Sequence, residues 1–245
     1  MTRIVRLQAI LMLGLCAALV ARECIAKPGW VGPNDIGGVV TGARGPEAGV
    51  WVIAQTRELG TPRYAKIVVT DDRGRFLLPD LPQADYKVWA RGYGIKDSTP
   101  IRARGGSVVS LTAEQATPAE AARLYPGGYW YSMLKIPPAN AFLGAEPNKR
   151  IPAGVAEDEW INVMKQGTCV GCHQLGDEAT RTIPKAFASV GSSQAQWVRR
   201  IESGQAGPDM IERISTLGPL AFKYLADWTD RIRAGELPKA RPGRP

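Results

Sequence analysis

Short apolar segments recur through the first half of the chain and predict β-strands. They cover residues 38–41, 49–55, 65–70, 75–78, 86–90 and 108–111. Turn-forming sequences such as Asp71-Asp72-Arg73-Gly74 separate them. Strands that recur about every ten residues between turns are typical of an antiparallel β-sandwich. We therefore expect residues 35–113 to form such a sandwich.

Helical periodicity replaces this pattern in the second half. Trp160, Val163 and Met164 stand at helical spacing. A serine cap and an apolar stripe mark two further helices near the end of the chain. The predicted helices cover residues 156–165, 193–203 and about 219–233, with a Gly/Pro loop at 204–210. We expect residues 156–236 to form an all-α domain, followed by a tail at 237–245.

Residues 114–155 connect the two predicted domains. The segment is rich in Pro and Gly and carries a cluster of aromatic residues, namely Tyr125, Tyr129, Trp130 and Tyr131. We expect an extended linker whose aromatic side chains pack on one or both domains. The alternative is a patch on which a partner docks.

The N-terminus has the three parts of a secretory signal peptide. Arg3 and Arg6 precede an almost wholly apolar run, and small residues end the segment before Lys27. The apolar run is shorter than the roughly 20 residues that span a bilayer. We therefore expect residues 1–26 to be removed, which places the protein in the periplasm or outside the cell with no membrane span. A retained anchor and a lipid anchor on Cys24 or Cys16 are the alternatives.

Signal removal changes both the charge and the cysteine count. Three arginines and one glutamate leave, so the formal charge falls from +8 to about +6. Cys16 and Cys24 leave as well, and only Cys169 and Cys172 remain. The chain has a single histidine, His173, which restricts any metal site.

Residues 169–173 read Cys-Val-Gly-Cys-His, a pattern that predicts covalent attachment of one haem c. The two thiols add across the haem vinyl groups, and His173 becomes an axial ligand of the iron. A zinc site would need further Cys or His ligands that the mature chain lacks. A thioredoxin-type redox pair and a plain disulfide remain alternatives.

The region around this pentad resembles the class I cytochrome c family, in sequence order. The resemblance implies that the carbonyl of Pro184 accepts a hydrogen bond from the haem histidine, which fixes its tautomer. We also expect Arg181 to neutralise haem propionates and Trp197 to donate a hydrogen bond to one. A solvated face for Arg181 and a core position for Trp197 are the alternatives.

The sixth iron ligand cannot be a second histidine of this chain, because His173 is the only one, so the methionines are the candidates. Met164 lies on the wrong side of the pentad, and Met133 lies far upstream. Met210 follows His173 in a Gly/Pro loop, where class I cytochromes keep their methionine. We therefore expect Met210 to bind the iron, with an open sixth position as the alternative.

The first domain resembles the carboxypeptidase regulatory-like domains, which have an immunoglobulin- or transthyretin-like β-sandwich. The likeness rests on Gly37-Gly38-Val39-Val40, Gly49-Val50-Trp51-Val52 and the turn that ends at Arg75-Phe76. Related sandwiches sometimes bind carbohydrate, so a sugar is one expected ligand. The whole chain resembles bacterial exported proteins that join such a sandwich to a single-haem domain.

These observations predict a one-electron carrier rather than an enzyme. We expect a redox partner protein with an acidic surface, because residues 181–200 carry Arg181, Lys185, Arg199 and Arg200 and no acid. An exported protein rarely meets nucleic acid, so we expect no such partner. An open-iron haem enzyme or sensor, peroxidase-like in type, is one alternative. A carbohydrate- or partner-binding module with an accessory haem is the other.

Overall fold

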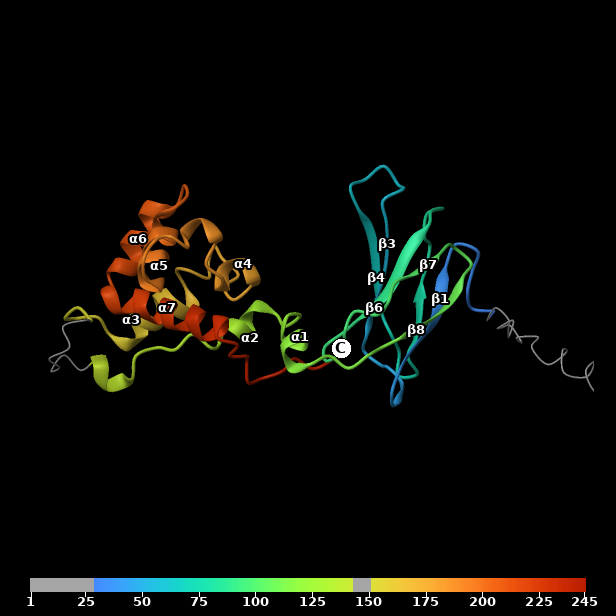
Figure 1. The fold of residues 1–245 in the computed structure, drawn as a ribbon, viewed down its shortest axis with the longest axis horizontal. Helices are drawn as coiled ribbons and strands as arrows, with labels where there is room; N and C mark the ends of the chain where they lie inside the picture. The colour runs from blue at the N-terminus through green and yellow to red at the C-terminus, as the bar shows by residue number, and fades with distance from the viewer. Residues whose placement is uncertain (1–28, 143–150) are drawn as a thin grey trace, which may run out of the picture.

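The computed structural model describes residues 29–142 and 151–245, so the predicted signal peptide at 1–26 lies outside the described residues. Strands come first along the described chain and helices follow (Figure 1). The strands are β1 Ile36–Gly42, β2 Gly45–Pro46, β3 Trp51–Thr56, β4 Tyr64–Val69, β5 Arg75–Leu78, β6 Tyr86–Arg91, β7 Ile101–Ala103 and β8 Val108–Thr112. The α-helices are α1 Pro118–Ala122, α2 Gly127–Tyr131, α3 Glu157–Ile161, α4 Glu178–Arg181, α5 Ser193–Glu202, α6 Gly207–Ser215 and α7 Pro219–Arg233.

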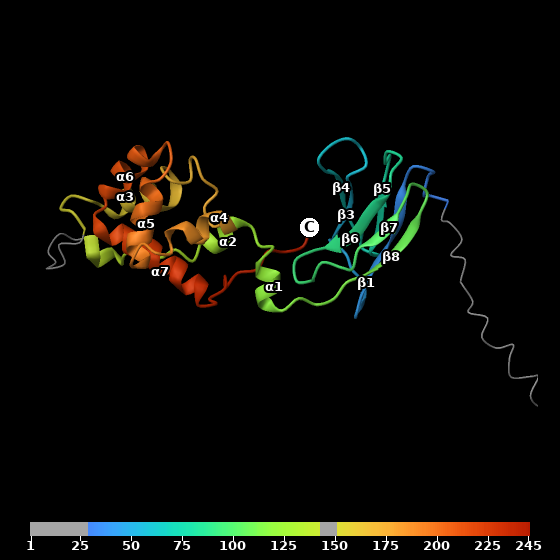
Figure 2. The ribbon, with the colours of Figure 1, turned by 45° about the horizontal axis from the view of Figure 1, so that its top comes forward.

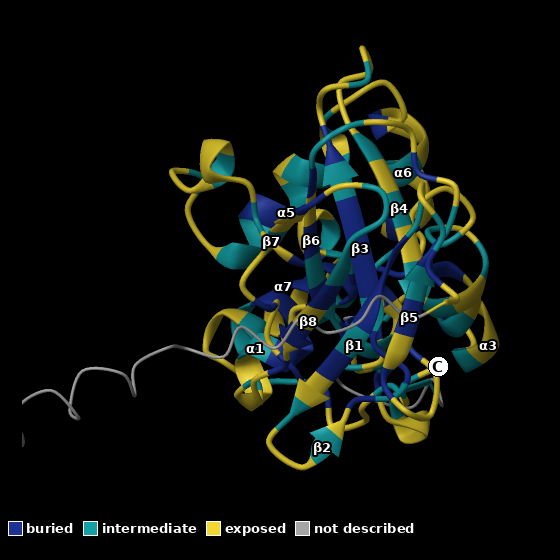
Figure 3. Cartoon of the chain, turned by 90° about the vertical axis from the view of Figure 1, so that its right-hand side faces the viewer, coloured by how far each residue is buried: buried dark blue, intermediate teal, exposed yellow. Residues whose placement is uncertain are grey.

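The strands form two four-stranded sheets. One has the order β4-β3-β6-β7, with antiparallel neighbours throughout. In the other, β1 pairs antiparallel with β2 and β5 and parallel with β8. The two sheets face each other across a common apolar core (Figure 2) that contains Val40, Leu78 and Leu111 of one sheet and Val52 and Val88 of the other. Figure 3 shows the burial along β1 and β3.

The predicted fold class, an antiparallel β-sandwich followed by an all-α class I cytochrome c domain, is wrong. The described residues hold eight strands in two sheets and seven short α-helices. The β1–β8 pair is parallel, so one sheet is mixed. Two of the helices, α1 and α2, lie before residue 156. Alternation along a strand shows which face is buried but not which direction its partner runs, so the sequence pattern could not predict the parallel pair.

The helical core gathers around two tryptophans that have no exposed surface, Trp160 of α3 and Trp228 of α7. The Trp160 ring lies edge-on to Tyr224 of α7, with ring centroids 6.0 Å apart. Helices α5 and α7 confirm the helices predicted over 193–203 and 219–233. Helix α3 is shorter than predicted, because residues Asn162–Gln166 continue it as a π-helical turn, η2.

The segment 114–155 is not simply extended, since it contains α1, α2 and the short 3-10 helix η1, Ala139–Phe142. A capping box starts α1: the Thr117 side chain accepts from the Glu120 N–H, and the Glu120 carboxylate accepts from the Thr117 N–H (2.8 Å). Tyr125 and Trp130 are buried in a small cluster with Ala121 and Ala122. Tyr93 of the strand region and Ile232 of α7 pack against this cluster.

The tail after α7 runs back to the strands (Figure 1). Its Arg244 forms an ion pair with Glu47, a carboxylate side chain that is almost entirely buried. The Nε of Arg244 also donates to the Tyr93 carbonyl (3.0 Å). Residues far apart in the sequence are thus joined by one guanidinium.

Within residues 29–142 and 151–245, none of the helices combines the length and the apolar character that a bilayer crossing requires.

Candidate functional site

The Cys-x-x-Cys-His pentad forms a single helical turn. The Gly171 N–H donates to the Gly167 carbonyl (2.9 Å), and the His173 N–H donates to the Cys169 carbonyl (3.1 Å). Residues three and four apart share a face of a helical turn. This backbone therefore brings Cys169, Cys172 and His173 within one hydrogen-bonded turn, an arrangement compatible with a single ligand that contacts all three.

The π-helical turn η2 positions this pentad. The Gly167 N–H donates to the Asn162 carbonyl five residues earlier (2.8 Å). A Cβ on Gly167 would lie 2.3 Å from the Asn162 Oδ1, so only glycine fits there without a shift. Insertions of this kind into an α-helix are frequent at functional sites. Here the insertion ends α3 and turns the chain into the pentad.

The two thiols are free and differ in exposure. Cys169 is half-buried and Cys172 is exposed. Burial raises the pKa of the Cys169 thiol. Cys169 in turn lies close enough to Tyr131 to contribute to the raised pKa of that phenol, of which burial is the larger cause.

Several apolar side chains that pack against the helical core are only partly covered. They come from the pentad, from the loop after it, and from α5 and α6. The set comprises Val170, Leu175, Ile183, Val198, Ile201 and Ile211. A flat apolar ligand held by Cys169 and Cys172 would contact such a surface and remove it from water, which is favourable.

Two buried polar atoms near this core have no hydrogen-bond partner. They are the hydroxyl of Tyr131 and the indole Nε1 of Trp160. A buried donor without a partner costs about 1–3 kcal/mol, so such groups mark places where a ligand oxygen would stabilise the structure. Sequence reasoning did not assign either residue to the site, because nothing in the sequence shows which buried donors lack a partner.

His173 and Pro184 are both exposed. Among the described residues, the His173 ring has no hydrogen bond. The Pro184 carbonyl accepts from the Phe187 N–H (2.9 Å) as the 3-10 helix η3, Lys185–Phe187, begins. The structure therefore does not join the imidazole to the Pro184 carbonyl, and that bond stays a prediction.

Met210 is half-buried in the first turn of α6, not in the expected loop. Its backbone N–H donates to the Ala206 carbonyl (3.0 Å). No helix was expected between residues 203 and 219, but α6 forms there, with Pro208 in its first turn, where proline is tolerated. The role of Met210 as an iron ligand stays a prediction.

Arg181 and Trp197 are buried and already have partners. The Arg181 Nη1 donates to the Gly176 carbonyl (2.7 Å), and its guanidinium lies 4.2 Å from the centre of the Trp130 ring. The Trp197 Nε1 donates to the Thr229 hydroxyl (3.1 Å). Contacts with haem propionates stay a prediction for both.

The basic stretch 181–200 is only partly exposed. Arg200 lies over the Trp197 ring and donates to two backbone carbonyls, those of Ala179 and Thr182 (2.5 Å each). Lys185 and Arg199 are exposed. Two of the four cations are therefore free to face a partner.

No cluster of three or more His, Cys, Asp or Glu side chains able to hold a metal ion occurs in the described part of the chain. An iron held by His173 and a methionine does not need such a cluster, because a porphyrin supplies four of the six ligands.

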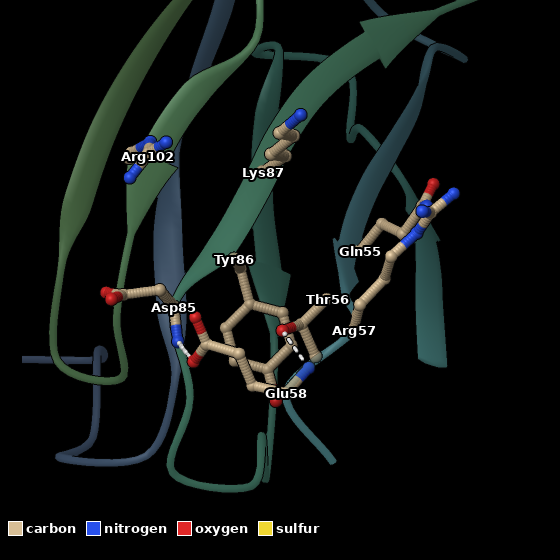
Figure 4. Close-up of a pocket in the computed structure, with 8 residues that line it drawn as sticks. All are labelled: Gln55, Thr56, Arg57, Glu58, Asp85, Tyr86, Lys87 and Arg102. Atoms are coloured by element: carbon tan, nitrogen blue, oxygen red, sulfur yellow. Dashed lines mark hydrogen bonds between the residues drawn. The ribbon is translucent and has the colours of Figure 1, made fainter. Parts of the chain in front are cut away.

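A cavity of about 380 Å³ lies on the strands, between the ends of β3, β6 and β7 (Figure 4). Gln55, Lys87 and Arg102 lie opposite one another on these strands. Glu58 accepts from the Asp85 N–H (2.9 Å) at its floor. The lining is polar, with Tyr86 as its single aromatic ring. Carbohydrate binding by the strands stays a prediction.

Comparison with known proteins gives no match: no family model fits the chain, and no curated protein is similar to it in sequence.

Proposed function

We propose that the chain carries one haem c on Cys169 and Cys172 and passes single electrons. What supports this most is the hydrogen-bonded turn over residues 167–173, which holds the two described cysteines and the one histidine of the sequence close together along the backbone. The group supplies a one-electron couple between ferrous and ferric iron when it is bound. His173 would bind its iron.

The residues around the pentad fit this group. Partly exposed apolar side chains such as Val170 and Ile211 would cover its flat faces. The unpartnered hydroxyl of Tyr131, a residue that interacts electrostatically with Cys169, is a donor suited to a carboxylate oxygen. Methionine coordination by Met210 would raise the potential and leave no open position. Export, predicted from residues 1–26, agrees with attachment outside the cytoplasm.

Mass spectrometry of the denatured, matured protein tests the proposal. We expect the mass of the chain plus one haem, and the mass of bare polypeptide for the double variant Cys169→Ser/Cys172→Ser. The matched control is Thr168→Ser, which changes a neighbouring hydroxyl residue and leaves both thiols. Bare polypeptide from the fully matured wild type would rule the proposal out.

We propose an acidic redox partner, because Lys185 and Arg199 are exposed in the segment that follows the pentad. A basic surface speeds encounter with a negative one, and salt weakens the effect. A small anionic oxidant should react faster than a cationic one at low salt only. Equal rates at all salt concentrations would contradict this partner.

A further inference from the structure

A second cavity lies apart from the Cys-x-x-Cys-His turn, between α1, α2, α4 and the end of α7. Its volume is about 700 Å³. Four apolar side chains form much of its wall: Trp130, Ile183, Ile232 and Leu237. None of the pentad residues lines it. The cavity has the size and the apolar lining that are usual for small organic ligands.

One wall of this cavity is a largely buried cation without a direct ion pair among the described residues. Arg181 is only 9% exposed. Its direct contacts are the Gly176 carbonyl and the Trp130 ring, and the carboxylates of Glu178 and Asp177 act on it only from a longer distance. Burial lowers the pKa of Arg181. A buried charge is costly unless an opposite charge is paired with it, so the site favours an anion.

The other charges of the cavity limit what that anion can be. Arg123 also has no ion pair, whereas Arg233 is paired with Asp230 (2.6 Å). The carboxylate of Glu178 lines the same cavity. Two free guanidiniums and one free carboxylate suit a single negative charge better than a dianion such as phosphate. A planar guanidinium can also donate two parallel hydrogen bonds to the two oxygens of one carboxylate.

We propose that this cavity binds a small amphipathic carboxylate, an organic acid with an aromatic or aliphatic body. Its carboxylate would lie against Arg181 and Arg123, and its body against Trp130 and the aliphatic wall. The site is independent of the haem proposal, because no residue of the pentad takes part. Arg181, expected from the sequence to meet haem propionates, would then meet the carboxylate of a second ligand.

Calorimetric titration of the full chain, purified with whatever haem it carries, tests this site with 2-naphthoate as the probe. We expect one site per chain, at least tenfold weaker binding of the uncharged 2-naphthalenemethanol, and no competition from inorganic phosphate. Arg123→Gln, an exposed position, should weaken 2-naphthoate binding about threefold or more. Arg181→Gln should weaken it at least tenfold. Glu178→Gln should tighten it.

Arg199→Gln is the matched control, since it removes an exposed guanidinium of α5 that has no described partner. Its affinity for 2-naphthoate should equal that of the wild type. Because Arg181→Gln can lose stability, Arg123→Gln and Glu178→Gln decide the outcome if that variant unfolds. Absence of saturable binding, or affinities that Arg123→Gln and Glu178→Gln leave unchanged, would overturn the proposal. If only haem-free chains bound 2-naphthoate, a haem propionate would be the natural partner of Arg181, and the proposed second ligand would be ruled out.

Discussion

Met210 is placed where its thioether can be tested as an iron ligand with little damage to the fold. It is half-buried in the first turn of α6, and its side chain makes no described hydrogen bond there. The oxidised protein should show the weak near-infrared band of methionine-to-iron coordination, and Met210→Ala should abolish it. Met133→Ala, which removes a partly buried methionine before the pentad, should keep the band. Absence of the band in the wild type would favour an open-iron enzyme or sensor.

Two glycines allow α2 to lie directly against the loop after the pentad. A Cβ on Gly176 would lie 2.0 Å from the Gly127 carbonyl oxygen, and Gly176 has a φ of +95°. Alanine there would combine a backbone clash with a left-handed conformation. The contact holds the carbonyl to which Arg181 donates.

We therefore predict that Gly176→Ala lowers the free energy of unfolding by about 3 kcal/mol or more. Gly204→Ala is the matched control, because Gly204 has a φ of +91° and open space where its Cβ would stand. It should cost only about 1–2 kcal/mol, the cost of the left-handed conformation. Urea denaturation measures both, and equal losses would show that the clash is relieved by a small shift.

At the scale of elements, Asp177 caps the four-residue helix α4. Its carboxylate accepts from the Thr180 N–H (2.8 Å), and this hydrogen bonding lowers the pKa of Asp177 below its ordinary value of 3.8. A lowered carboxyl pKa means that the cap contributes fully above pH 3.8 and loses its contribution as the pH falls toward the folded-state value. So short a helix depends strongly on its cap.

Asp177→Ala should lower the free energy of unfolding by about 1 kcal/mol at pH 7. The difference from the wild type should shrink below pH 3.8, because the protonated wild-type side chain is a weaker acceptor. Asp209→Ala removes an exposed carboxylate in the first turn of α6 that has no described hydrogen bond, and it should cost a few tenths of a kcal/mol. A pH-independent difference for Asp177→Ala would contradict the role of the carboxylate.

Helices and strands could be predicted from the sequence where a few neighbouring residues determine them. The apolar stripe of α7 and the serine cap of α5 are encoded within a few residues, and the structure has both helices. The parallel β1–β8 pair and the π-helical turn η2 depend on contacts or strain that no short window shows. The same limit applies to the site: the pentad is visible in the sequence, whereas the cavity beside Arg181 is built from four separate elements.

At the scale of the molecule, Arg244 ties the tail to the strands through Glu47. The Glu47 side chain is almost wholly buried, and Arg244 is its ion-pair partner. Removing one partner of a buried pair leaves the other charge uncompensated. Loss of Arg244 should therefore destabilise the strands, where Glu47 is buried, although Arg244 itself lies in the tail.

Arg244→Gln should lower the free energy of unfolding of the strand region by about 1–3 kcal/mol. Arg241→Gln, which changes an exposed arginine of the same tail without a described partner, should have no measurable effect. The double variant Arg244→Gln/Glu47→Gln should recover part of the loss. Thermal unfolding with a tryptophan signal measures all four proteins, and equal stability of Arg244→Gln and the wild type would contradict the tie.

The position of β1 between β5 and β8 also affects the order in which the strands can pair during folding. The parallel partner of β1 follows roughly 70 residues later, and closing so long a loop costs entropy before any hydrogen bond forms. Distant pairings of this kind slow folding, whereas the short-range contacts of the helices form quickly. Until residues 108–112 arrive, one edge of β1 offers unpaired N–H and C=O groups to any neighbouring chain. The folding chain therefore has an open strand edge on β1, to which another chain can pair, until β8 docks.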